Sequence, residues 1–67
     1  MQVKKIKFKN GSWVVVFIAQ NGMIYEVHSN GLVYPHKTFV VLEELCAELI
    51  SSLSPARGEA TVDEVHK

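Results

Sequence analysis

The sequence predicts an α+β fold, a three- to four-stranded antiparallel β-meander packed on one C-terminal α-helix. Asn-Gly pairs at residues 10–11, 21–22 and 30–31 separate apolar or alternating runs. Such pairs are typical of β-hairpin turns, because both residue types tolerate the positive φ of tight turns. One stretch with helical periodicity follows at residues 38–53. The 67 residues are enough for one domain with a thin core.

The strands are expected between the Asn-Gly turns. The first runs from Val3 to Lys9, the second from Ser12 to Ala19, and the third from Met23 to Ser29. A short fourth strand is expected from Leu32 to Tyr34. Pro35 should end it, because proline has no N–H to donate to a neighbouring strand.

The helix is expected to begin at Thr38 or Phe39 and to end at Leu53. Thr38 is a suitable N-cap. The apolar positions of the helix share one side at the helical period: Phe39, Leu42, Leu45, Cys46, Leu49, Ile50 and Leu53. Residues 55–67 are polar, so we expect a single domain at residues 1–54 and a flexible tail at 55–67. A helical turn with Thr61 and Glu64 as a capping box is the alternative for the tail.

The turn lengths set which side chains share a face of the sheet. A two-residue loop at Asn10-Gly11 pairs Lys9 with Ser12. It predicts one face with Ile6, Phe8, Trp13, Val15, Phe17 and Ala19, and an opposite face with Lys5, Lys7, Lys9, Val14, Val16 and Ile18. A three-residue second loop is expected, because it keeps Met23, Tyr25 and Val27 on the first face. A two-residue third loop then adds Leu32 and Tyr34 to it.

One helix can cover only one face, so the second face is expected to be open. It would have an apolar centre with charged and polar residues around it, which is typical of interaction surfaces. The predicted interface residues are Val14, Val16, Ile18, Lys5, Lys7, Glu26 and His28. This pattern indicates a small protein-interaction or regulatory module, a homodimer or a binder of another protein. The alternative is a partly wet surface, since valine also suits a half-exposed sheet.

A row of lysines in the first strand makes nucleic acid the second hypothesis for the partner. Seven basic and seven acidic residues cancel, so the chain lacks the basic excess of dedicated nucleic-acid binders. The first strand nevertheless carries Lys5, Lys7 and Lys9 on one face, about 7 Å apart, a spacing suited to successive phosphates.

Residues 8–53 resemble the arm-type DNA-binding domains of tyrosine integrases, which are related to the AP2 fold. Gly-Ser-Trp at residues 11–13 opens a strand and Lys-Thr-Phe at 37–39 leads into the helix, as in those domains. The resemblance implies a three-stranded meander on a C-terminal helix, with DNA as ligand. That family has basic and polar residues where this chain has Val14, Val16 and Ile18, so no site residue is carried over.

The sequence predicts no enzyme, cofactor or metal site. His28, His36 and His66 lack metal-ligand spacing, and no nucleophile elbow or phosphate loop is present. The one cysteine, Cys46, lies among apolar helix positions and is expected to act as a small hydrophobe in a cytoplasmic protein. Lysines near the N-terminus interrupt any apolar segment of the kind that a signal peptide needs, so we expect no signal peptide. The longest apolar run, residues 13–19, is too short to span a membrane as a helix.

Overall fold

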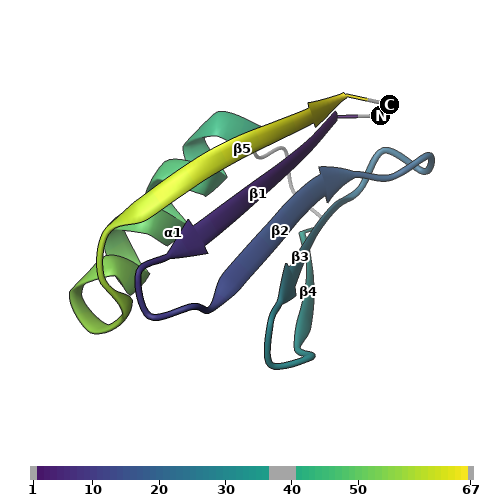
Figure 1. Ribbon diagram of the computed structural model, residues 1–67. Helices are drawn as coiled ribbons and strands as arrows, with labels where there is room; N and C mark the ends of the chain where they lie inside the picture. Colours follow the sequence, from purple (N-terminus) through teal and green to yellow (C-terminus); the bar gives the residue numbers. More distant parts are fainter. Residues whose placement is uncertain (1, 37–40, 67) are drawn as a thin grey trace.

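The computed structural model describes residues 2–36 and 41–66. One antiparallel sheet, in the order β4-β3-β2-β1-β5, lies against a single helix (Figure 1). This confirms the predicted α+β class. The elements are β1 (Gln2–Phe8), β2 (Trp13–Ile18), β3 (Ile24–His28), β4 (Val33–His36), α1 (Leu42–Arg57) and β5 (Ala60–His66).

The three hairpins share one kind of loop, three residues long with glycine last. The hydrogen bonds that close the loops link Phe8 with Ser12, Ala19 with Met23, and His28 with Leu32. The glycines have φ of 96°, 83° and 94°, which is the left-handed bulge conformation. The asparagine side chain of each loop accepts the backbone N–H two residues later, at Ser12, Met23 and Leu32.

The first hairpin corrects the predicted register by one residue. Ile6 pairs with Val14 and Lys7 with Trp13, rather than Lys9 with Ser12. Asn10 favours the longer loop, because its Oδ1 accepts both the N–H and the hydroxyl of Ser12, at 2.9 and 2.6 Å. A slip of one residue turns every side chain of β2 to the other face.

Hydrogen bonds also fix the lengths of the other two loops and the register of the strands that these loops join. The second has the three predicted residues, so β3 keeps its predicted register with β2 and changes face with it. The third has three residues instead of the predicted two, and Val27 therefore pairs with Val33. The two slips compensate for each other at β4, where Tyr34 pairs with Glu26 on the side of the sheet that faces the helix.

The core lies between α1 and the helix-facing side of β1, β2 and β3. Its buried members are Ile6, Phe8, Val14, Val16, Ile24, Leu42, Leu45 and Cys46. Leu49, Ile50 and Leu53 are partly buried against them, which confirms the predicted apolar side of the helix. The predicted N-cap, Thr38, and the first predicted apolar position, Phe39, lie outside the described residues.

The helix begins and ends later than predicted. Val41 occupies the N-cap position without a side-chain hydrogen bond, and α1 continues past Leu53 to Arg57. Pro55 lies inside its last turns, where the missing N–H removes a single intrahelical hydrogen bond. Gly58, with φ of 91°, then ends the helix and donates its N–H to the carbonyl of Ser54.

The segment expected to be a flexible tail instead completes the sheet. Residues 60–66 form β5, which pairs antiparallel with β1 from Phe8–Ala60 to Gln2–His66. The start of β1 and the end of β5 consequently lie side by side (Figure 1). The domain therefore extends beyond the predicted boundary at residue 54, and β1 is an inner strand.

Candidate functional site

No element of the described residues covers the side of the sheet opposite α1, which we call the free face. Side chains alternate between the two faces of a strand, so the observed register assigns its members. The free face comprises Val3, Lys5, Lys7, Trp13, Val15, Phe17, Tyr25, Val27, Val33, Pro35, Thr61 and Asp63. Its centre, on β2 and β3, is aliphatic and aromatic.

Aromatic contacts organise the middle of the free face. The rings of Phe17 and Tyr25 stack with their centroids 5.7 Å apart and an interplanar angle of 27°. The Nζ of Lys5 lies 5.1 Å from the centroid of the Trp13 ring, within cation–π range. Trp13, Phe17 and Tyr25 are each only partly buried, by their neighbours on the same face.

The charged groups of the free face lie on its β1–β5 flank. Lys7 Nζ is 3.2 Å from Asp63 Oδ2, and both side chains are more than half exposed, so this ion pair adds little stability. Lys4 points to the other side of the sheet and pairs with Glu43 of α1 at 3.5 Å. On the free face, β2 and β3 carry no charged residue.

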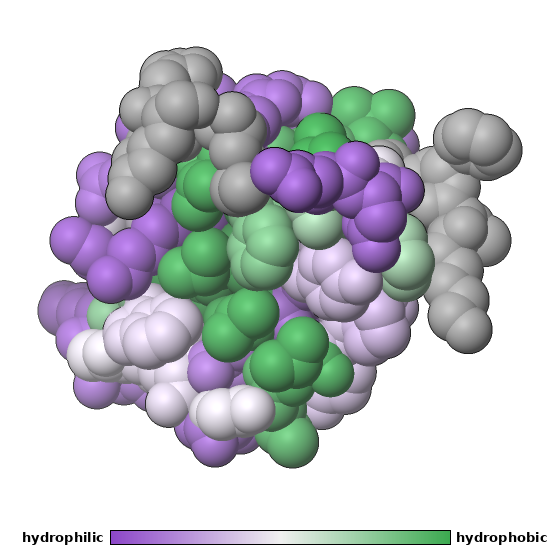
Figure 2. Space-filling view, turned by 90° about the vertical axis from the view of Figure 1, so that its right-hand side faces the viewer, coloured by the Kyte–Doolittle hydropathy of each residue, from purple (hydrophilic) through white to green (hydrophobic). Residues whose placement is uncertain are grey.

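Seen from the side on which β3 and β4 lie, hydrophobic side chains form a band across the middle of the molecule (Figure 2). Strongly hydrophilic side chains lie above this band and on its left, and side chains of intermediate hydropathy lie beside it on the right (Figure 2). Val33, on the outer strand β4, is 52% exposed. The open surface thus has an apolar centre and a polar rim, the pattern that the sequence predicts but on the alternate residues.

The structure separates the seven predicted interface residues. Lys5 and Lys7 lie on the free face, as predicted. The predicted placement is wrong for the other five: Val14 and Val16 are fully buried under α1, Ile18 is partly buried against the same core, and Glu26 and His28 also face the helix side. The slip in the first turn explains these misplacements. The same alternation, with a three-residue loop, would have identified Trp13, Val15, Phe17, Tyr25 and Val27.

Glu26 joins two histidines on the helix-facing side of β3 and β4. One of its carboxyl oxygens bonds to Nε2 of His28, and the other lies 3.0 Å from Nε2 of His36. The ring of Tyr34 meets His28 edge to face, with centroids 5.3 Å apart. Glu26 and His28 are only 7% and 8% exposed. These hydrogen bonds satisfy the buried polar groups, so a structural role is sufficient.

The described residues contain no group of three or more His, Cys, Asp or Glu arranged to hold a metal ion. Burial raises the pKa of the Cys46 thiol, an effect that Lys4 opposes and Glu43 reinforces. A raised pKa keeps the thiol protonated at neutral pH, and the thiolate is the nucleophilic form. Cys46 therefore acts as a core residue, as its position in the sequence predicts.

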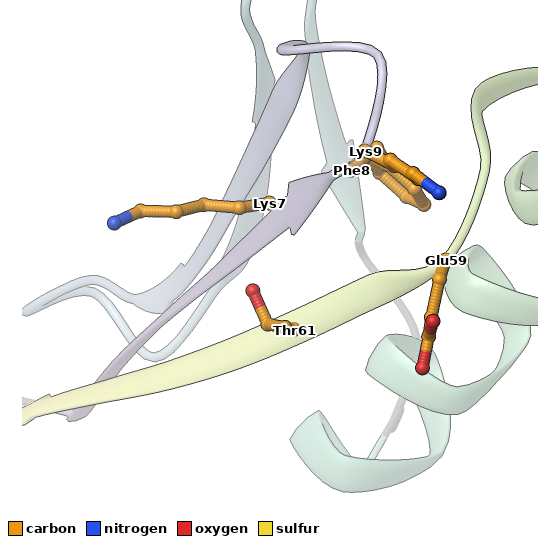
Figure 3. Close-up of a pocket in the computed structure, with 5 residues that line it drawn as sticks. All are labelled: Lys7, Phe8, Lys9, Glu59 and Thr61. Carbon is orange, nitrogen blue, oxygen red and sulfur yellow. The ribbon is translucent and has the colours of Figure 1, made fainter.

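A shallow pocket lies where β1 ends and β5 begins, lined by Lys7, Phe8, Lys9, Glu59 and Thr61. Lys7 points away from Lys9 and Glu59, on the other side of the strand pair (Figure 3). The charged groups do not converge on one point, and their arrangement therefore offers no evident ligand chemistry.

No helix in the described part of the chain is long and apolar enough to cross a membrane. The chain matches no protein-family model, and comparisons with curated proteins and with solved structures found no match either.

Proposed function

We propose that this chain is a small non-enzymatic protein-interaction module that docks through the free face, and that its partner there is a second copy of the chain. The supporting observation is the continuous group formed by Trp13, Val15, Phe17, Tyr25 and Val27, which no described element covers. Full burial of one large apolar side chain contributes about 1.5–3 kcal/mol. Each of these five side chains is still partly exposed, so a part of that free energy remains to be gained by docking.

Three properties favour a second copy as the partner. Homodimer interfaces are the most apolar class of protein interface, and the centre of this face carries no charge. A two-fold axis that runs parallel to the strands over β2 would place Lys5 of one protomer opposite Val27 of the partner subunit, so like charges do not meet. A chain of 67 residues has a thin core and gains from additional burial.

The buried free thiol of Cys46 suits a cytoplasmic setting.

Val15→Glu is expected to halve the mass of the assembly. Val15 lies at the centre of the free face, and a carboxylate there would lose its hydration if a second copy docked. The monomer should remain folded, because Val15 pairs directly with Lys5 and is only half buried. Multi-angle light scattering after size exclusion gives the mass, and far-UV circular dichroism reports the fold.

Val41→Glu provides the matched control. Val41 is 53% exposed at the start of α1, away from the free face, so this variant should retain the wild-type mass. The fluorescence of Trp13, the single tryptophan, should shift to shorter wavelength as concentration rises in wild type but not in Val15→Glu. Equal masses for wild type and Val15→Glu would contradict the proposed use of this face.

Single-stranded nucleic acid is the second candidate partner. Three aromatic rings on an open sheet face beside Lys5 resemble a base-stacking platform. The charge distribution favours it less. Phosphate contacts dominate affinity for nucleic acid, but Asp63 pairs with Lys7 and Glu43 pairs with Lys4.

The nucleic-acid candidate predicts quenching of Trp13 when mixed-sequence oligonucleotides are added at low salt. Binding should weaken steeply with added salt, and Lys5→Glu with Lys7→Glu should abolish it. Our primary proposal predicts no quenching at protein concentrations where the free face is already paired. Salt-sensitive quenching that the two lysine substitutions abolish would favour nucleic acid over self-docking.

A further inference from the structure

The three hairpin loops each place an asparagine directly before a glycine on the surface of the molecule. Asn10, Asn21 and Asn30 are exposed, and so are the glycines that follow them. An Asn-Gly pair can deamidate without an enzyme, because glycine has no Cβ to hinder the approach of its nitrogen to the carboxamide carbon Cγ of the asparagine. The chain therefore holds three copies of one reactive dipeptide, and the surroundings of each copy decide how fast it reacts.

The folded form of each loop opposes this reaction through the same two hydrogen bonds. The N–H of the glycine, which must lose its proton to attack, donates to the carbonyl of the residue three positions earlier at 2.9 Å. The Oδ1 of the asparagine accepts the backbone N–H two residues later at 2.9 or 3.0 Å. Attack by the glycine nitrogen consequently requires the loop to open, and the free energy of that local opening sets the rate.

The first two loops have additional contacts that oppose opening. The Oδ1 of Asn10 also accepts the hydroxyl of Ser12 at 2.6 Å, and the backbone N–H of Asn10 donates to the carbonyl of Arg57 at 3.0 Å. The Nδ2 of Asn21 donates to the hydroxyl of Tyr25 at 3.3 Å. Each of these bonds has to break before the carboxamide can turn toward the glycine nitrogen.

The third loop is the least restrained. Within the described part of the chain, the side chain of Asn30 makes no hydrogen bond beyond the one from the N–H of Leu32. This loop joins β3 to β4, which has four residues, lies at the edge of the sheet and contains Pro35 (Figure 1). The first two loops join strands that each have a neighbouring strand on both sides. Local opening should therefore cost least at Asn30.

We propose that Asn30 is the principal deamidation site of the folded chain, and that the isoaspartate formed there releases β4. The nitrogen of Gly31 bonds to Cγ of Asn30 and gives its proton to water, and the carboxamide nitrogen takes a proton from water and leaves as ammonia. Water then opens the resulting succinimide ring at one of its two C–N bonds. Cleavage at Cγ gives aspartate, and cleavage at the main-chain carbonyl carbon gives isoaspartate, whose chain continues through the side chain.

The two products differ in their effect on β4. An aspartate leaves the main chain unchanged, and its carboxylate still accepts the N–H of Leu32. An isoaspartate inserts a CH2 group into the main chain, so the N–H of Gly31 no longer reaches the carbonyl of His28 while the strands stay paired. Val33 and Tyr34 are 52% and 46% exposed, so little burial holds β4 in place once the loop is altered.

Peptide mapping by mass spectrometry of the full chain tests the site. The protein is aged at neutral and mildly alkaline pH, folded and in urea, and deamidation is followed at each asparagine. In urea the three sites should react at similar rates, because glycine follows each of them. In the folded chain Asn30 should react about fivefold faster than Asn10 and Asn21, the ratio that one additional hydrogen bond produces. A folded chain in which either site reacts as fast as Asn30 would overturn the assignment.

Ser12→Ala is the matched variant for the order of the sites. It removes the hydroxyl that donates to Asn10 Oδ1 and leaves the third loop unchanged. Deamidation at Asn10 should become about fivefold faster, and the rate at Asn30 should stay as in wild type. An unchanged rate at Asn10 would contradict the inference that these side-chain hydrogen bonds set the order.

Asn30→Asp tests the release of β4, because it carries the charge of the isoaspartate form without the added CH2 group. The N–H of Tyr34 points toward Glu26 of β3, so its amide exchange reports whether β4 is paired. Exchange at Tyr34 should be several-fold faster in the isoaspartate form, isolated from aged protein by chromatography, than in Asn30→Asp. Equal exchange in the two proteins would show that β4 stays paired and would overturn its release.

Discussion

Val14→Asp is expected to abolish the folded state, whereas Val15→Asp should leave the monomer folded. Val14 is fully buried beneath α1 and pairs with Ile6, so a carboxylate there would lose its hydration in the core. An uncompensated buried charge costs several kcal/mol. A domain of this size has a free energy of unfolding of about 0.05–0.15 kcal/mol per residue, so this cost is comparable to the whole stability.

The neighbouring position should respond differently. Val15 lies on the free face opposite Lys5, where an aspartate remains hydrated and has a cation near it. Far-UV circular dichroism and thermal melts of the two variants test the register directly. A two-residue first loop predicts the reverse result, an unfolded Val15→Asp and a folded Val14→Asp, and that result would show that β2 faces the other way.

Gly58→Ala is expected to lower the free energy of unfolding by about 2–3 kcal/mol. Gly58 has φ of 91° and ψ of −177°, a backbone region that only glycine occupies at low cost. A Cβ at this position would lie 2.8 Å from Cβ of Lys9, closer than real Cβ contacts. Relief by backbone movement would disturb the hydrogen bonds from Lys9 to Glu59 and from Asn10 to Arg57, which join β1 to the start of β5.

Gly22→Ala is the matched control for this prediction. Gly22 also has positive φ, at 83°, but no atom lies within 4 Å of the position of its missing Cβ. We expect this variant to cost only the conformational strain, about 1 kcal/mol. Urea unfolding of both variants gives the two free energies. A Gly58→Ala cost no larger than that of Gly22→Ala would show that the Lys9 contact does not constrain the α1–β5 junction.

The order of strands and helix follows from local signals in the sequence. Asn-Gly pairs set the turns, and the spacing from Leu42 to Leu53 set the helix and its buried side. Strand β5 was missed, because an edge strand with one wet face has few apolar residues, and Thr61, Asp63 and Glu64 look like a solvated tail. Its pairing partner, β1, is more than fifty residues away in the chain, beyond any local pattern.

The length of the first turn decides which residues of β2 belong to the candidate site. The sequence predicts an open apolar face with Lys5 and Lys7 at its margin, and both lysines do lie on the open face. Because the first loop is one residue longer than predicted, β2 presents Trp13, Val15 and Phe17 on the open face, and Val14 and Val16 face the helix. The sequence leaves that choice open, because β2 is apolar on both sides and burial alone does not select either face. The hydrogen bonds between Asn10 and Ser12 distinguish the two loops.

Isotope-filtered nuclear Overhauser measurements on a mixture of labelled and unlabelled protein test most directly whether the free faces of two chains dock. Docking of the free faces predicts intermolecular contacts from the indole of Trp13 and the methyl groups of Val15 to Tyr25 of the partner subunit and Val27 of the partner subunit. An associated protein whose intermolecular contacts avoid all four of these positions would contradict it.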